Sequence, residues 1–105
     1  MKTQIRKIKF FFQRLLRGWD DSETWDLDET FKEWFLPRFK QYRKLKIGTP
    51  FCDEPYEYAV KKWDDILEKI ESGLSLDSYS FDPDEEAKIQ EAYELLGKYF
   101  RCLWW

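Results

Sequence analysis

The helical spacing of the apolar residues is the feature that most constrains the fold of this chain. Apolar side chains recur three or four positions apart in residues 4–17, 27–47, 55–71 and 83–103, which is the pattern of amphipathic helices. No segment has the strict alternation of a half-buried strand. At 105 residues the chain has the size of one domain. We therefore predict an all-α fold, a compact four-helix bundle-like single domain covering residues 1–105.

Glycine and proline mark where these helices begin, bend and end. Gly18 is expected to stop the first helix, and Pro55 to stand in the first turn of the third. Pro37 falls inside the second periodic segment, so we predict a kink there. Gly97 lies within the last helix at a cost of about 1 kcal/mol relative to alanine. We expect the close approach of another backbone to explain it.

The segment before the second helix is rich in acids. Asp26 and Glu29 fit a capping box, and Asp82–Glu85 fits another at the last helix. Arg38 falls on the apolar stripe of the second helix, where a charge should be paired. An acid from residues 20–28 is the expected partner, and anion binding by Arg38 is the alternative. The residues to which we assign structural roles are Asp21, Asp26, Asp28 and Pro37.

The composition argues against most catalytic chemistry. There is no histidine, which is the commonest general base and metal ligand. Cys52 and Cys102 are too few and too far apart for a zinc site or a disulfide framework. We predict a protein that is not an enzyme and uses no cofactor. No apolar run approaches the length that spans a membrane, and the basic N-terminal segment is not a signal peptide.

Clustered carboxylates provide the one enzyme-like alternative, a Mg²⁺-dependent nucleotide hydrolase. Oxygen ligands for Mg²⁺ could come from Asp20, Asp21, Glu23, Asp26 and Asp28. Two Glu-x-x-Glu pairs, Glu68/Glu71 and Glu91/Glu94, lie away from the apolar stripes of their helices, and this favours a solvated face.

Cations close to aromatic residues indicate binding. Aromatic residues make up 20% of the chain, more than a small core can hide, so some should lie at a ligand surface or an interface between copies. The predicted ligand-binding residues are Arg14, Arg17, Trp19, Trp25, Arg38 and Arg43. Such groups suit a nucleotide, an acidic protein surface or a nucleic acid. The basic helix over residues 4–17 is either a solvated face, a membrane-surface helix or a phosphate-binding helix.

Four stretches of the chain resemble a family of small proteins encoded by tailed bacteriophages and prophages. They are RGWDDSETWDLD, FLPRFKQYR, WDDILEKI after Pro50, and GKYFRCLWW. The resemblance implies phage origin and action in the cytoplasm of the infected bacterium. It does not indicate any particular activity. Binding to a host factor, or sequestering a nucleotide signal of a host defence system, would suit such a protein. The more basic, phenylalanine-rich start departs from the family, so the resemblance gives residues 4–17 no role.

Overall fold

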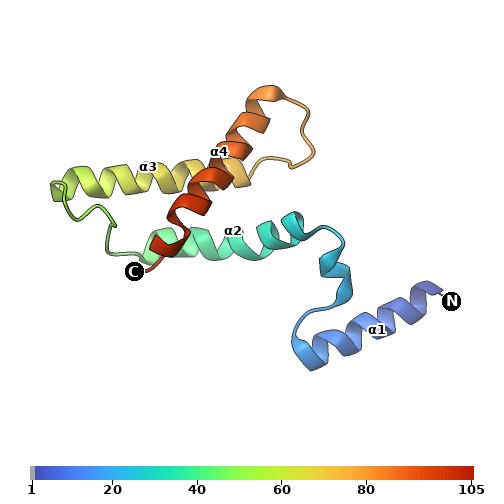
Figure 1. Cartoon of the computed structure of the whole chain (residues 1–105). Helices are drawn as coiled ribbons and strands as arrows, with labels where there is room; N and C mark the ends of the chain where they lie inside the picture. The colour runs from blue at the N-terminus through green and yellow to red at the C-terminus, as the bar shows by residue number, and fades with distance from the viewer. Residues whose placement is uncertain (1) are drawn as a thin grey trace. The chain divides into compact units, whose positions relative to one another are not determined.

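The computed structural model describes residues 2–105, and within them the chain is all-helical. Its α-helices are α1 (Lys2–Arg17), α2 (Leu27–Leu45), α3 (Tyr56–Leu74) and α4 (Pro83–Tyr99), with short 3-10 helices η1 (Asp21–Thr24) and η2 (Phe100–Cys102) (Figure 1). No strand occurs in this part of the chain. The all-α prediction with four helices is confirmed.

The chain divides into two compact units, residues 1–33 and residues 34–105. Helix α2 begins in the first unit and continues into the second. The single domain over residues 1–105, the closed four-helix bundle and the kink at Pro37 stay predictions. Pro37 does lie inside α2, as its position in the periodic pattern indicated.

In the first unit, α1 is ended by Gly18 and followed by a capped turn. Gly18 has φ +82° and its N–H donates to the Arg14 carbonyl (2.9 Å), so the helix stops where the sequence predicted. The next residues form a capping box that sequence reasoning missed. The Ser22 N–H donates to the Asp20 carboxylate (2.8 Å) and the Asp20 N–H donates to Glu23 (2.7 Å).

The core of the second unit is built mainly on α3. Its fully buried side chains include Trp63, Leu67, Ile70 and Leu74, and Phe39 of α2 is 2% exposed. Trp63 forms edge-to-face contacts with Phe51 and Tyr99, at ring-centroid distances of 6.2 Å and 5.7 Å. Asp82 caps α4 by accepting from the Asp84 N–H (2.9 Å), with Pro83 in the first turn.

Helices α3 and α4 cross at Gly73 (Figure 1). A Cβ added to Gly73 would lie 2.6 Å from the Lys88 carbonyl oxygen and would clash with Ala92 Cβ. The expectation that a backbone approaches Gly97 is wrong, because nothing lies within 4 Å of a Cβ added there. The close approach predicted for α4 is made instead by a glycine of α3.

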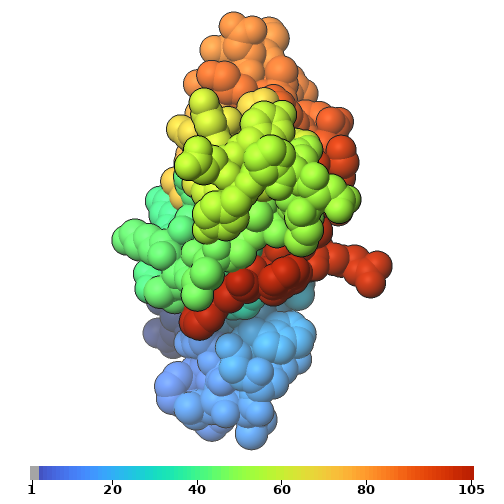
Figure 2. Space-filling view, turned by 90° about the vertical axis from the view of Figure 1, so that its left-hand side faces the viewer, coloured from blue at the N-terminus to red at the C-terminus, as the bar shows by residue number. Residues whose placement is uncertain are grey.

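The C-terminal residues lie against the segment that follows α2. Tyr42 donates its hydroxyl to the Trp104 carbonyl (2.9 Å), and a Cβ added to Gly48 would lie 3.2 Å from the Trp105 carbonyl oxygen. Figure 2 shows the red C-terminal residues beside the green residues after α2. The side chains of Trp104 and Trp105 are both exposed. The Trp104 carbonyl is therefore hydrogen-bonded, while both indole rings stay open to solvent.

Two glycine substitutions test the crossing. Gly97→Ala should raise the free energy of unfolding by about 1 kcal/mol, because alanine favours an open helix position. Gly73→Ala should lower it by about 1–3 kcal/mol, because the new methyl group meets a packed backbone. Urea unfolding followed by circular dichroism measures both. A Gly73→Ala protein as stable as the parent chain would show that α3 and α4 do not pack this closely.

Candidate functional site

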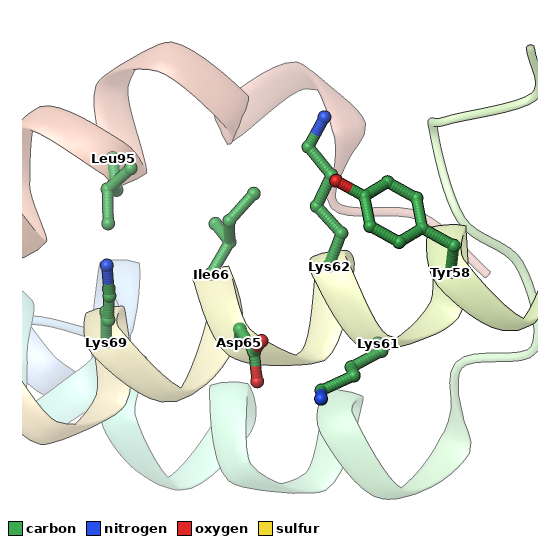
Figure 3. A pocket seen from close by; sticks show the side chains of 7 residues that line it. All are labelled: Tyr58, Lys61, Lys62, Asp65, Ile66, Lys69 and Leu95. Atoms are coloured by element: carbon green, nitrogen blue, oxygen red, sulfur yellow. The ribbon is translucent and has the colours of Figure 1, made fainter. Parts of the chain in front are cut away.

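A groove lies between α3 and α4 in the second unit (Figure 3). It has a volume of about 440 Å³, within the range of small-molecule sites. Its lining comes from α3 except for one α4 residue: Tyr58, Lys61, Lys62, Asp65, Ile66, Lys69 and Leu95. Figure 3 shows Lys62, Ile66 and Lys69 directed from α3 toward α4, and Leu95 directed from α4 toward α3. The groove thus has an apolar floor and a cationic rim.

The position of these side chains follows from the helical period of α3. Tyr58, Lys61, Lys62, Asp65 and Lys69 fall within an arc of about 100° around the helix axis and so share one face of the helix. The adjoining stripe, which includes Trp63 and Leu67, is buried in the core. Burial of that stripe fixes the rotation of α3 and leaves the polar face at the groove.

The three lysines of the groove differ in their partners. Lys62 Nζ lies 3.0 Å from the Glu54 carboxylate and 4.3 Å from the centroid of the Phe51 ring, and Lys69 Nζ lies 3.4 Å from the Glu91 carboxylate. Lys61 has no hydrogen-bond or ion-pair partner among residues 2–105. Lys61 is therefore the groove-lining lysine whose ammonium group has no partner in the described residues, and Figure 3 shows its side chain directed away from α4.

The hydrogen bond to Glu54 also affects protonation. It raises the pKa of Lys62 above its ordinary value of 10.5, so this side chain is a permanent cation at neutral pH. An ammonium group has three donors, and one carboxylate leaves donors free for a second anion. The second carboxylate oxygen of Glu54 is buried without a hydrogen-bond partner.

A second hollow of about 460 Å³ continues the groove toward the crossing at Gly73. The two hollows share Asp65 and Lys69. Glu68 and Glu91 line this second part, together with Ser72 and Lys88. The groove is therefore cationic at the Tyr58 end and richer in carboxylates near the crossing. These carboxylates include Glu68 and Glu91, one from each of the Glu-x-x-Glu pairs noted in the sequence.

The structure places four of the predicted ligand-binding residues in the first unit. Arg14 lies 2.5 Å from the Asp20 carboxylate and Arg17 lies 2.6 Å from that of Asp21. The Arg17 guanidinium also stacks 3.8 Å from the centroid of the Trp19 ring. Trp25 lies apart from these, in edge-to-face contact with Phe10 at 5.7 Å. Arg14 and Arg17 are thus already neutralised by acids of the turn.

The acidic turn is held by α1. Asp20 is 3% exposed, and hydrogen bonds from Ser22 and Arg14 hold the pKa of its carboxyl below the usual value. Asp21 exchanges hydrogen bonds with Gln13, its N–H donating to the side-chain carbonyl oxygen and its carboxylate accepting from the amide (2.8 Å each). The predicted partner of these acids was Arg38, and the structure pairs them instead with Arg14 and Arg17. The physical reason is proximity along the chain: Gly18 turns the acids back onto the last turns of α1.

The other two predicted ligand-binding residues lie in the second unit. Arg38 donates to the Trp34 carbonyl (2.7 Å) and its guanidinium lies 4.5 Å from the centroid of the Trp34 ring. Arg43 lies 3.2 Å from the Glu71 carboxylate and so joins α2 to α3. Lys46, the residue that follows α2, also pairs with α3: its Nζ lies 2.7 Å from the Asp64 carboxylate. Arg43 therefore serves as a contact between helices in this structure.

Two further carboxylates, those of Asp26 and Asp28, lie close together near the start of α2. The Asp26 side chain beside Asp28 raises the pKa of Asp28 above its usual 3.8. Within residues 2–105, however, no group of three or more Asp, Glu, Cys or His side chains is arranged to hold a metal ion. The paired carboxylates of Asp20 and Asp21 face the cations of α1.

Sequence reasoning missed the groove of α3 and α4. The signal was present as the polar stripe from Tyr58 to Lys69, which runs beside the apolar stripe on α3. Only the apolar stripe was used to predict the helix. Which polar stripe borders a hollow depends on where α4 crosses, and the spacing of residues on α3 does not contain that information.

Comparison with protein-family models, curated proteins and solved structures finds no match to this chain. No helix in residues 2–105 combines the length and the apolar character needed to cross a membrane.

The pKa of Asp21 is a test of the paired turn. The hydrogen bonds from Gln13 and Arg17 lower it from 3.8 to about 2. A lowered folded-state pKa stabilises the turn above pH 3.8, and this stabilisation is lost as the pH falls through about 2. Carboxyl-carbon NMR should give a midpoint near 2 for Asp21, and Gln13→Ala should move it upward. A midpoint close to 3.8 in the parent chain would show that the turn is not held by α1.

Proposed function

We propose that this chain is a small, non-catalytic binding protein that holds a nucleotide-type anion in the groove between α3 and α4. In the setting that the phage resemblance implies, it sequesters a nucleotide signal of a host defence system in the cytoplasm of the infected bacterium. The observation that carries the proposal is the unpartnered Lys61 at the rim of a groove with an apolar floor.

The chemistry of the groove matches the two parts of a nucleotide. Lys61, with the spare donors of Lys62 and Lys69, offers positive charge to a phosphate. Tyr58 is 58% exposed, and its ring provides a flat surface on which a base can stack. Ile66 and Leu95 supply apolar area beneath it. A ligand with a planar ring and one or two phosphates would use all three features together.

The charge state of the groove favours binding over proton transfer. A lysine acts as a general base when its pKa is lowered toward neutrality. Glu54 has the opposite effect on Lys62 and raises its pKa. Lys62 is thus suited to stabilise an anion, and it is poorly suited to remove a proton.

A host protein remains the second candidate partner. The observation in its favour is the set of exposed aromatic side chains, which includes Trp34, Trp104 and Trp105. Tryptophan is enriched in the energetically dominant positions of protein interfaces. Self-association through the same rings is the homo-oligomer form of this proposal.

The nucleic-acid and Mg²⁺-hydrolase alternatives have less support. The pairing of Lys9, Arg14 and Arg17 with Asp20 and Asp21 reduces the positive charge that α1 can offer to phosphates. The same pairs occupy Asp20 and Asp21, two of the five carboxylates offered as metal ligands.

The nucleotide proposal does not depend on how the two units are arranged. Every lining residue of the groove lies within residues 34–105. A closed bundle of all four helices, with α2 kinked at Pro37, is a separate proposal that the groove does not require.

Calorimetry with cyclic mononucleotides and dinucleotides tests the proposed function. Lys61→Ala should weaken binding about tenfold or more, because a hydrogen bond to a charged group is worth about 1.5–3 kcal/mol. Tyr58→Ala should weaken it by a similar factor through lost stacking. Lys98→Ala and Tyr56→Ala, which change residues outside the groove lining, are the matched controls.

Either of two results would contradict the proposal of a nucleotide site in the groove. If no nucleotide binds, or if Lys61→Ala binds as tightly as Lys98→Ala, the groove is not a nucleotide site. Capture of one host protein that is lost on Trp34→Ala would then favour the second candidate.

A further inference from the structure

A hollow lies where the loop that follows α3 meets the first turns of α4. Its volume is about 510 Å³, within the range of small-molecule sites. Residues 78–81 of the loop form one side of it, and Glu86, Ile89, Gln90 and Tyr93 of α4 form the other. None of these residues lines the groove between α3 and α4. The hollow is therefore a separate place on the surface of the second unit.

The helical period of α4 brings its four lining residues together. Successive members of this set lie three or four positions apart along the chain, apart from the adjacent Ile89 and Gln90, and so share one face of the helix. The neighbouring stripe of α4, with Ala92 and Leu96, is buried in the core. Burial of that stripe fixes the rotation of α4 and directs the face with Glu86 and Tyr93 toward the loop.

The loop is held in a defined turn by its own hydrogen bonds. The Ser80 N–H donates to the Asp77 carbonyl (3.1 Å), and the Tyr79 N–H donates to the Asp77 carboxylate (3.0 Å). The Asp82 N–H donates to the Ser80 hydroxyl (3.2 Å). Asp and Ser side chains bonded to nearby backbone in this way stabilise turns. The backbone on both sides of Phe81 is thus hydrogen-bonded before any ligand arrives.

Three aromatic rings line the hollow, those of Tyr79, Phe81 and Tyr93. Tyr93 is half-buried beside Ile89, whereas Tyr79 is 65% exposed and Phe81 is 97% exposed. A side chain exposed to this degree takes no part in the core, so the Phe81 ring is open to contact by a ligand. The face of an aromatic ring attracts a cation that lies within about 6 Å of its centroid.

The charge around the hollow is negative. Its lining contains the Glu86 carboxylate and no Lys or Arg side chain. That carboxylate has no hydrogen-bond or ion-pair partner among residues 2–105. Residues 74–87 contain five acids and no basic residue. Such surroundings repel a phosphate and attract a cation.

We propose that this hollow binds a small organic cation, a quaternary ammonium group or an alkylated amine. The carbon groups around such a charge suit an aromatic lining, and the charge itself lies against the ring faces with Glu86 as the counter-ion. A bare metal ion fits less well, because it needs several oxygen ligands and the lining supplies one carboxylate. The phosphate ligand proposed for the groove is excluded from this hollow by its charge.

A pair of ligands with the same shape tests the proposal. Choline carries a quaternary nitrogen, and 3,3-dimethylbutan-1-ol has an uncharged carbon in its place. In NMR titrations of the ¹⁵N-labelled full chain, choline should shift the amide signals of residues 78–93. The alcohol should bind about fivefold more weakly or not at all, because it lacks the charge that the rings attract. Choline binding should also weaken in high salt.

Substitutions locate the contact. Tyr79→Ala and Phe81→Ala should each weaken choline binding about threefold through the loss of one ring. Glu86→Gln should weaken it by about threefold as well, as expected for a partly exposed ion pair. Glu85→Gln is the matched control, because it removes the same charge one residue away and outside the lining. The control should bind choline more tightly than Glu86→Gln does.

The proposal is overturned if choline leaves the amide signals of residues 78–93 unmoved, or if the alcohol binds as tightly as choline. The comparison of the two ligands uses the parent chain, so it does not depend on how well a variant folds. Equal weakening by Glu85→Gln and Glu86→Gln would also overturn it, because the cation would then respond to the general field of the acids and not to the hollow.

Discussion

The close crossing of α3 and α4 at Gly73 is the constraint on which the rest of the second unit depends. With no side chain at residue 73, the α4 backbone at Lys88 reaches α3 directly. The groove runs from that point along α3 toward Tyr58. A bulkier residue at 73 would move α4 and with it Leu95. The groove is thus a consequence of where one glycine lies on α3.

In the first unit, ion pairs and hydrogen bonds, not apolar packing, join the acidic turn to α1. Within residues 3–33, whose burial the structure describes, no side chain belongs to the apolar core, and the one buried residue is Asp20. Ion pairs and an amide hydrogen bond join the turn to α1 on its polar side. Exposed ion pairs contribute little stability singly, but here they form a network that fixes which side of α1 the turn covers.

The sequence predicted the helices well and their contacts poorly, for physical reasons. Gly18 and Asp82 are local signals, and each marks the end or start of a helix at the place where the structure has it, whereas periodicity alone placed the ends of α2, α3 and α4 two to four residues away. Close approach is a property of two helices together, so Gly97 was chosen in place of Gly73. The same holds for the acids of the turn, whose nearest cations are set by the reversal at Gly18. Lys61 was missed because a polar stripe becomes a site only when a second helix borders it.

The central claim is that the α3–α4 groove, with Lys61 at its rim, is the ligand site of this protein. Amide chemical-shift changes in ¹⁵N-labelled chain, titrated with a cyclic dinucleotide, test it most directly. The account predicts that the changes concentrate at Tyr58, Lys61 and Leu95. Changes confined to Arg14, Arg17 and Trp19, with the groove unmoved, would contradict it.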